Sequence, residues 1–147
     1  MTVKEISRDV LRILGHTWCA PLTIFGLIYA LVFTTLGWYS WDSRQGSALV
    51  FNTSKMPQWL EKLWRGWAGH TVGHVVVLSV VETRARSITL RHEQEHIAQM
   101  MRLGVFHPVI YLIIMGVIKL SCKNIEPYKM NVFEIDARRA AGQPVDL

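Results

Sequence analysis

The sequence predicts an α+β protein that is mostly helical, with one N-terminal transmembrane helix followed by a single small domain. Three observations support this fold class: a long uncharged segment near the N-terminus, two short stretches of strand-like composition, and several helical segments with capping residues. Of 147 residues, 50% are hydrophobic and 18% are charged, against about 25% charged in ordinary soluble domains. This length allows one domain, and the composition excludes wholesale disorder.

The net charge of +5 does not indicate nucleic-acid binding, because the 16 Lys and Arg residues are scattered and form no basic block. Basic residues together with six tryptophans are typical of a surface that faces anionic lipid headgroups. The two cysteines, Cys19 and Cys122, are too few for a disulfide framework and lack the paired spacing of a structural zinc site. We therefore expect a lipid bilayer, and no nucleic acid, among the partners.

An uncharged segment of 29 residues lies between Arg12 and Asp42. A helix needs about 20 apolar residues to cross the hydrocarbon core of a bilayer. The sequence therefore predicts an N-terminal flank at 1–12, a transmembrane anchor at 13–41 and a domain at 42–147. A signal peptide and a buried helix are the alternatives, although a signal peptide has a shorter apolar core and a small-residue cleavage site. Aromatic residues suited to the two membrane interfaces are Trp18, Trp38, Tyr39 and Trp41.

Downstream of the anchor, composition and capping residues predict short strands and helices. Strands are expected where apolar residues lie between turn-forming residues, and helices between a polar capping residue and a glycine. One helical segment with three tryptophans either lies at the membrane interface or packs on the core. The expected strands are Ala48–Phe51 and Val72–Val81, and the expected helices are Pro57–Trp67, Ser87–Leu103 ended by Gly104, Val105–Leu120 and Asn131–Gly142.

The helix Ser87–Leu103 carries an H-E-x-x-H motif, from His92 to His96. Residues four apart share a helix face, so the two imidazoles can bind one metal ion while Glu93 reaches a water molecule beside it. The alternative is a charged helix face that points to solvent. A catalytic zinc takes three protein ligands and keeps a fourth position open, so the motif needs one more ligand.

Four downstream side chains are candidates for this third ligand: His107, Glu126, Glu134 and Asp136. The residue ten positions after the first motif histidine is Arg102, which excludes the class with a third histidine at that place. His107 lies in an apolar segment, where a satisfied polar group is the more common interpretation. Glu134 is the better candidate, but the segment Asn131–Glu134 also matches a capping box, in which the glutamate bonds back to the helix start. The residues alone leave both interpretations of Glu134 open.

Four segments resemble a group of small bacterial membrane proteins, whose broader relatives are gluzincin-type zinc peptidases. That group carries H-E-x-x-H-x-x-Q, an aromatic-Pro-Tyr segment, N-P-F-E-x-[DE]-A and a T-L-G-H-V-V-L-type strand. The likeness extends over roughly Leu11–Ala141, with Val132 in place of the usual proline. The matching segments are His92–Gln99, Gly104–Tyr111, Asn131–Ala137 and Thr71–Leu78.

This resemblance implies a minimal zincin-like unit of short strands, the motif helix, an apolar helix and a C-terminal ligand helix. It implies one Zn²⁺ per chain held by His92, His96 and Glu134, with Glu93 as the general base. Asp136 would support these ligands or replace Glu134 among them. Iron, cobalt or manganese would also fit such ligands. The resemblance further implies a prokaryotic inner or cell membrane, and the basic residues slightly favour a cytoplasmic N-terminus.

Two further expectations concern the surroundings of this site. A substrate strand is expected to pair along Val72–Val81, where His74 either polarises a substrate carbonyl or is a hydrogen-bonded structural histidine. If Val105–Leu120 crossed the membrane, His96 and Glu134 would lie on opposite sides and could not share an ion. Its 16 residues reach only about 24 Å, so we predict a buried or re-entrant helix; two full crossings would require another third ligand.

Together these patterns predict a membrane-anchored, zinc-dependent metallopeptidase that acts on a peptide or a membrane protein. Two alternatives stay open. One is a non-catalytic membrane protein with a structural or vestigial metal site, which would have four protein ligands. The other is a metal-free helper subunit of a membrane complex.

Overall fold

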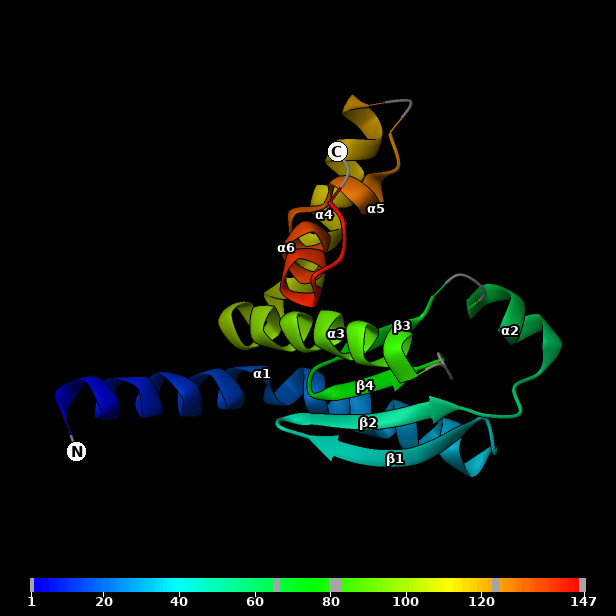
Figure 1. Cartoon of the computed structure of the whole chain (residues 1–147), viewed down its shortest axis with the longest axis horizontal. Coiled ribbons are helices and arrows are strands. Elements are labelled where there is room, and N and C mark those ends of the chain that lie inside the picture. Colours follow the sequence, from blue (N-terminus) through cyan, green and yellow to red (C-terminus); the bar gives the residue numbers. More distant parts are fainter. Residues whose placement is uncertain (1, 65–66, 80–82, 123–124, 146–147) are drawn as a thin grey trace.

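The computed structural model describes residues 2–64, 67–79, 83–122 and 125–145, and within them it confirms a mostly helical α+β fold. The elements are α1 (Val3–Thr35), β1 (Tyr39–Gln45), β2 (Ala48–Thr53), α2 (Gln58–Trp64), β3 (Gly69–Val72), β4 (Val75–Leu78), α3 (Thr83–Leu103), α4 (Phe106–Ser121), α5 (Pro127–Met130) and α6 (Val132–Ala141). The four strands described form one sheet, with α1 and α3 against it, whereas α4 projects away (Figure 1).

The strand order in the sheet is β1-β2-β4-β3. β1 pairs with β2 and β3 pairs with β4 in antiparallel fashion, whereas β2 and β4 run parallel. The predicted strand Val72–Val81 is therefore wrong as a single element. β3 ends at Val72, Gly73 turns the chain with a φ of 62°, and β4 covers only Val75–Leu78. Residues 80 and 81 lie outside the described ranges.

The sheet lies between α1 and α3, because apolar side chains alternate along its strands. In β4, Val75 and Val77 pack with Ala30 of α1, and Val76 packs on the other face with Ile97 of α3. All residues of β4 are buried. The core is thus two apolar layers on either side of the sheet, and the motif helix α3 covers one of its faces.

α1 is long and apolar enough to cross a membrane, and it is the one helix in the described residues that meets this test by itself. It covers Val3–Thr35 rather than 13–41. Tyr39 belongs to β1 and to the core rather than to a membrane interface, because its side chain is buried among apolar residues. One face of α1 packs on the domain, while the opposite face exposes apolar side chains: Ile24, Phe25, Ile28 and Leu31.

Glycine allows α1 to approach the sheet closely. A methyl group added at Gly26 would collide with the carbonyl oxygen of Val72 at the end of β3. We therefore expect Gly26→Ala to destabilise the protein by about 1–3 kcal/mol through overpacking. Gly116 of α4 is a matched control, since an added methyl group there meets open space and should stabilise the helix by about 0.5–1 kcal/mol. Chemical denaturation of both variants measures the two changes, and equal effects would contradict the packing described here.

α4 turns sharply away from α3, at an angle of 109°. Gly104, with a φ of 56°, ends α3 in the left-handed conformation, as predicted. Of the two forms expected for Val105–Leu120, the buried one is wrong, because large apolar side chains project from α4 to the outside, and a re-entrant helix stays a prediction. His107 is buried at the base of the helix. The exposed apolar residues of α4 include Leu112, Ile113, Val117 and Leu120.

The remaining helices differ from expectation mainly at their ends. α3 begins before Ser87, whose hydroxyl donates to the carbonyl oxygen of Arg84 and so caps nothing. α2 ends at Trp64, and the predicted Pro57–Trp67 segment includes residues 65 and 66, which lie outside the described ranges. α6 has the predicted Asn131 as its N-cap and Gly142, with a φ of 68°, as its C-cap.

Candidate metal centre

The H-E-x-x-H motif lies in the middle of α3, where one side of the helix faces the sheet and another faces α6. Ile97 packs on the sheet, which fixes the rotation of α3 about its axis. Residues four apart then point together toward α6, as His92 and His96 do. α6 supplies Glu134, and all three of these side chains are buried.

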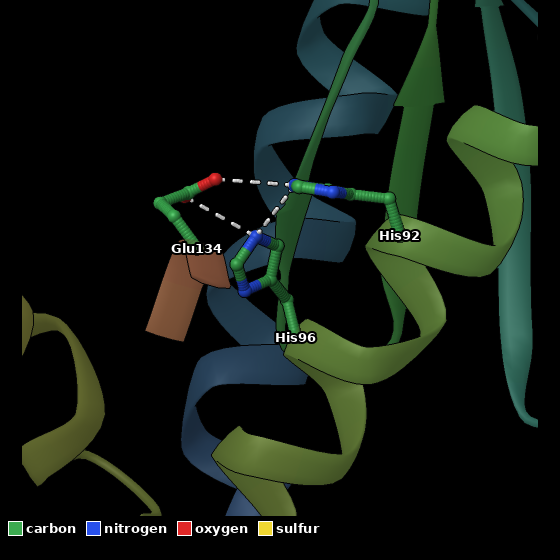
Figure 2. Close-up of side chains that lie close together, drawn as sticks. All are labelled: His92, His96 and Glu134. Carbon is green, nitrogen blue, oxygen red and sulfur yellow. Dashed lines mark hydrogen bonds and ion pairs between the residues drawn. The ribbon is translucent and has the colours of Figure 1, made fainter. Parts of the chain in front are cut away.

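His92, His96 and Glu134 converge on one point (Figure 2). The two Nε2 atoms are 3.2 Å apart. Oε2 of Glu134 lies 3.2 Å from Nε2 of His92, and Oε1 lies 3.4 Å from Nε2 of His96. Ligand atoms about 2.0–2.2 Å from a tetrahedrally coordinated zinc ion are about 3.3–3.6 Å from one another. The two contacts of Glu134 involve its two different oxygens, and each of the three side chains offers a ligand atom within 4.8 Å of the others. The three side chains are therefore close enough together to share one such ion.

Glutamine side chains fix the tautomers of both histidines. Oε1 of Gln99 lies 2.9 Å from Nδ1 of His96, and Oε1 of Gln143 lies 3.1 Å from Nδ1 of His92. An amide oxygen only accepts hydrogen bonds, so both Nδ1 atoms donate and both Nε2 atoms carry lone pairs. The amide of Gln99 is itself oriented, because its nitrogen donates to the backbone carbonyl of Phe133 at 3.0 Å.

With these tautomers, the Nε2 atoms of His92 and His96 and the carboxylate of Glu134 are all acceptors, and they converge in the protein interior with no donor from the described residues between them. Oε2 of Glu134 is buried and forms no hydrogen bond of ordinary geometry with any described residue, although Nε2 of His92 is near. Such a buried, unsatisfied carboxylate oxygen is costly. A divalent cation would satisfy all three acceptors at once, and two imidazoles with one carboxylate are a ligand set that suits zinc. The side chains present fit the ion that the motif predicts.

Protonation is the competing way to relieve this convergence of acceptors. Burial lowers the pKa of His96, but hydrogen bonding and the charge of Glu134 outweigh burial and raise it above the ordinary value. Burial also opposes ionisation of Glu134, yet the neighbouring histidines outweigh burial and hold the pKa of this carboxyl well below its usual range. Glu134 is therefore a carboxylate at neutral pH and carries the negative charge that a carboxylate ligand of a metal needs.

The capping-box interpretation of Glu134 is wrong. Oδ1 of Asn131 accepts from the backbone N–H of Phe133 at 3.1 Å and caps α6 by itself. The side chain of Glu134 turns toward the histidines, and its Oε1 accepts a hydrogen bond of 2.8 Å from the hydroxyl of Tyr111. A helix N-terminus also stabilises this negative charge, since Glu134 lies in the first turn of α6.

The structure does not bring the other candidate ligands to this centre. Asp136 is exposed and lies 3.6 Å from Arg139. Glu126 is exposed and pairs with Lys129. His107 is buried close by, but its Nε2 contacts Oε1 of Gln99 at 3.3 Å, so it supports that glutamine rather than the metal position.

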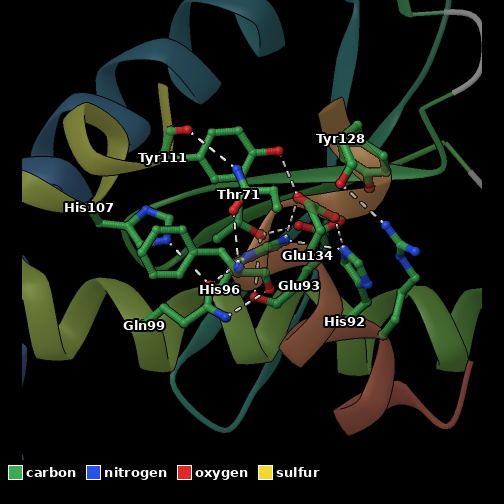
Figure 3. A network of polar contacts seen from close by, with 12 residues as sticks. Thr71, His92, Glu93, His96, Gln99, His107, Tyr111, Tyr128 and Glu134 are labelled. Carbon is green, nitrogen blue, oxygen red and sulfur yellow. Dashed lines mark hydrogen bonds and ion pairs between the residues drawn. The ribbon is translucent and has the colours of Figure 1, made fainter. Parts of the chain in front are cut away.

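Glu93 lies beside the triad on the side of the sheet (Figure 3). Its Oε2 accepts a hydrogen bond of 2.5 Å from the hydroxyl of Thr71 in β3. Burial raises the pKa of Glu93, while the neighbouring histidines and Thr71 lower it, and burial prevails. A carboxylate with a raised pKa accepts a proton more readily than an ordinary glutamate.

His74 does not reach this centre. Its Nδ1 lies 2.6 Å from the hydroxyl of Thr23, and its Nε2 lies 2.8 Å from Nδ1 of His16. Both partners belong to α1, so these contacts support the interpretation of His74 as a structural histidine.

Gln99, Gln143, Tyr111 and Thr71 take part in the network, and reasoning from the residues assigned no role to any of them. Gln99 carries a usable signal, because it follows His96 by three positions and so shares its helix face. Gln143 and Tyr111 come from other segments. Tyr111 ends the segment Gly104–Tyr111 that carries part of the resemblance, but its spacing from the motif does not show that the two meet.

Comparison with protein-family models, with curated proteins and with solved structures found no match. Any function assigned to the chain therefore rests on the geometry and chemistry of this centre.

The role of Gln99 predicts a change in metal affinity. We expect Gln99→Leu to weaken zinc binding by about 10–100-fold, as loss of an outer hydrogen-bond partner of a ligand typically does. Gln94, on the same helix but partly exposed, is the matched control as Gln94→Leu. Competition with a chelating dye measures both affinities. Equal affinities for the two variants would contradict the proposed orientation of His96.

Proposed function

We propose that this protein is a membrane-associated, zinc-dependent metallopeptidase of the gluzincin type. The observation that carries the proposal is the meeting of three buried acceptor atoms from His92, His96 and Glu134, with Glu93 directly beside them. Three protein ligands leave one tetrahedral position open, which is typical of catalytic rather than structural zinc.

His92, His96 and Glu134 would hold the ion, and the glutamines behind the histidines keep the rings in place. When bound, zinc polarises a scissile carbonyl and makes a water molecule more acidic. The tyrosine hydroxyl that donates to Glu134 fixes the carboxylate in its position. The protein thereby supplies a preformed ligand set that needs little rearrangement to bind the ion.

Glu93 would act as the general base. Its carboxylate accepts a proton from the water whose oxygen attacks the carbonyl carbon, and it returns that proton to the amine nitrogen as the C–N bond breaks. Burial raises its pKa, which suits a group that must both accept and release a proton. The hydroxyl of Thr71 donates to one of its carboxylate oxygens and so orients the side chain.

The place of a substrate strand differs from the expectation at Val72–Val81. β4 is paired on both sides, with β2 and β3, and cannot accept another strand. β3 is the strand at this edge of the sheet, and its Thr71 touches the general base. We propose that an extended peptide adds to β3, where its backbone would pass beside Glu93.

Membrane association is supported by two apolar surfaces. α1 exposes large apolar side chains along its outer face, and α4 exposes them along most of its length. Monomeric soluble proteins rarely expose apolar surfaces of this extent. We propose contact with the membrane through both helices, in a prokaryotic inner or cell membrane.

Metal-dependent hydrolysis tests the proposal. The full chain, purified in a non-ionic detergent and loaded with one equivalent of zinc, is incubated with a mixture of unstructured peptides, and products are identified by mass spectrometry. We expect cleavage that stops after chelation and returns when zinc is restored. Absence of cleavage by the zinc-loaded protein, or cleavage that survives chelation, would contradict the proposal.

A structural metal site is the second candidate function, and the burial of all three ligands favours it. His92, His96 and Glu134 are each at most 9% exposed, whereas substrates must reach a catalytic ion. In that case zinc would raise the stability of the chain, and Glu93→Gln would alter neither metal content nor stability strongly. The number of protein ligands separates the two functions, since structural sites have four.

A further inference from the structure

A second candidate site lies away from the metal centre, where α1, the β1–β2 hairpin and α3 meet. A cavity of about 390 Å³ is found there. β1 runs back beside α1, so Arg44 of β1 and Arg12 of α1 line the same cavity. The residues that line it are Arg12, His16, Arg44, Gly46, Ser47 and Met101.

The polar lining of this cavity is basic. Arg12 and Arg44 form no ion pair with any carboxylate of the described residues, and no acidic residue is among the lining residues. Nε of Arg44 donates to the carbonyl oxygen of Gly46 at 3.1 Å, which holds its guanidinium over the hairpin. Two exposed arginines and Ser47 among the lining residues supply guanidinium and hydroxyl donors, which suit phosphate oxygens.

A chain of hydrogen bonds holds His16 at the wall. The hydroxyl of Thr23 donates to the carbonyl oxygen of Cys19, so Nδ1 of His74 must donate to Thr23. Nε2 of His74 then accepts from Nδ1 of His16 at 2.8 Å. His16 is thereby held among the residues that line the cavity. The hydrogen bonds join the half-buried His16 and Thr23 of α1 to the buried His74, so the side chain of His16 is held in place at this wall.

We propose that this cavity binds a phosphate group, either of an anionic phospholipid headgroup or of a free phosphate compound. Arg12 is the last charged residue before the long uncharged segment, and neighbouring side chains of α1, Leu11 and Leu14, are apolar and exposed. A phosphate bound at Arg12 and Arg44 therefore lies beside a surface suited to acyl chains. The site is independent of zinc and of peptide hydrolysis.

Calorimetric titration of the full chain in a non-ionic detergent tests this proposal. The probes are inorganic phosphate, dihexanoyl-phosphatidylglycerol and dihexanoyl-phosphatidylcholine. We expect Arg12→Gln/Arg44→Gln to weaken binding by about tenfold or more, because hydrogen bonds to charged groups are lost. Arg8→Gln/Arg91→Gln removes the same net charge from exposed positions outside the cavity and should leave the affinity within about twofold.

Ser47→Glu keeps both arginines but places a negative charge in the cavity, so it should abolish binding even if the double variant fails to fold. Binding of phosphatidylglycerol without binding of inorganic phosphate identifies a lipid headgroup, and binding of both identifies phosphate in general. The proposal is overturned if the unaltered protein binds none of the probes. It is equally overturned if both arginine double variants lose affinity to the same degree, or if Ser47→Glu binds like the unaltered protein.

Discussion

Replacing Glu134 with glutamine is expected to weaken zinc binding by more than about 100-fold, beyond the effect typical of outer-shell residues. The substitution keeps the size of the side chain but removes its negative charge, and an amide is a poorer ligand for zinc. The two histidines alone would then face each other across 3.2 Å with one uncharged neighbour. Metal content after gel filtration, measured by atomic emission, should fall from about one zinc per chain to a small fraction.

Asp136→Asn is the matched control for this experiment, because Asp136 lies on the same helix, carries the same charge and is exposed. Its metal content should equal that of the unaltered protein. If Asp136→Asn lost zinc while Glu134→Gln kept it, the ligand assignment from the structure would be wrong. Circular dichroism of both variants shows whether α6 is retained.

Replacing Glu93 with glutamine is expected to leave zinc bound and to lower the rate of peptide hydrolysis by about 10²–10⁴-fold, the usual contribution of a general base. The amide cannot accept a proton from the attacking water. It still fits between Thr71 and the triad, so the metal ligands stay in place. Single-turnover kinetics on a peptide found by the cleavage assay, together with metal analysis, measure both quantities.

Glu95→Gln is the control for Glu93→Gln, since Glu95 stands two residues further along the same helix and pairs with Arg102 outside the triad. Its rate should differ little from that of the unaltered protein. A Glu93 variant that hydrolyses peptide at the original rate would refute the catalytic role and leave the structural metal site as the function of the triad. Loss of zinc by this variant would instead assign Glu93 to metal binding.

The helices around the site could be predicted because local signals define them. The two histidines of the H-E-x-x-H motif share a face only on a helix, so the motif predicts α3. Gly104 ends this helix in the left-handed conformation, which glycine tolerates best. α6 is bounded by Asn131 and Gly142, a cap and a stop that act within one turn. Such signals depend on near neighbours only, so a single sequence reveals them.

The sheet and the course of α1 could not be predicted in the same way. β1 contains Asp42 and Arg44 and has an exposed outer face, so it lacks the apolar alternation that marks a strand. α1 has an apolar outer face and a packed inner face, and hydropathy does not distinguish lipid from protein as the neighbour of an apolar residue. The close approach of Gly26 to β3 could not be predicted, because it depends on packing between segments far apart in the sequence.

In the candidate site too, the features set by neighbouring residues could be predicted, and those set by residues far apart in the sequence could not. The spacing of His92 and His96 is enough to predict that they lie together. Whether Glu134 is a metal ligand or part of a helix cap depends on the direction of its side chain, which the sequence does not give. The direction follows from how α6 packs on α3, which involves residues about 40 positions apart in sequence. Gln143 contacts His92 across a separation of 51 residues.

Anomalous scattering at the zinc edge from crystals of the full chain tests the central claim most directly. We predict one peak per chain, about 2.0–2.2 Å from Nε2 of His92, Nε2 of His96 and one carboxylate oxygen of Glu134, with no protein atom at the fourth position. A peak elsewhere, no peak after loading with zinc, or a fourth protein ligand on the ion would contradict an open, three-ligand zinc centre.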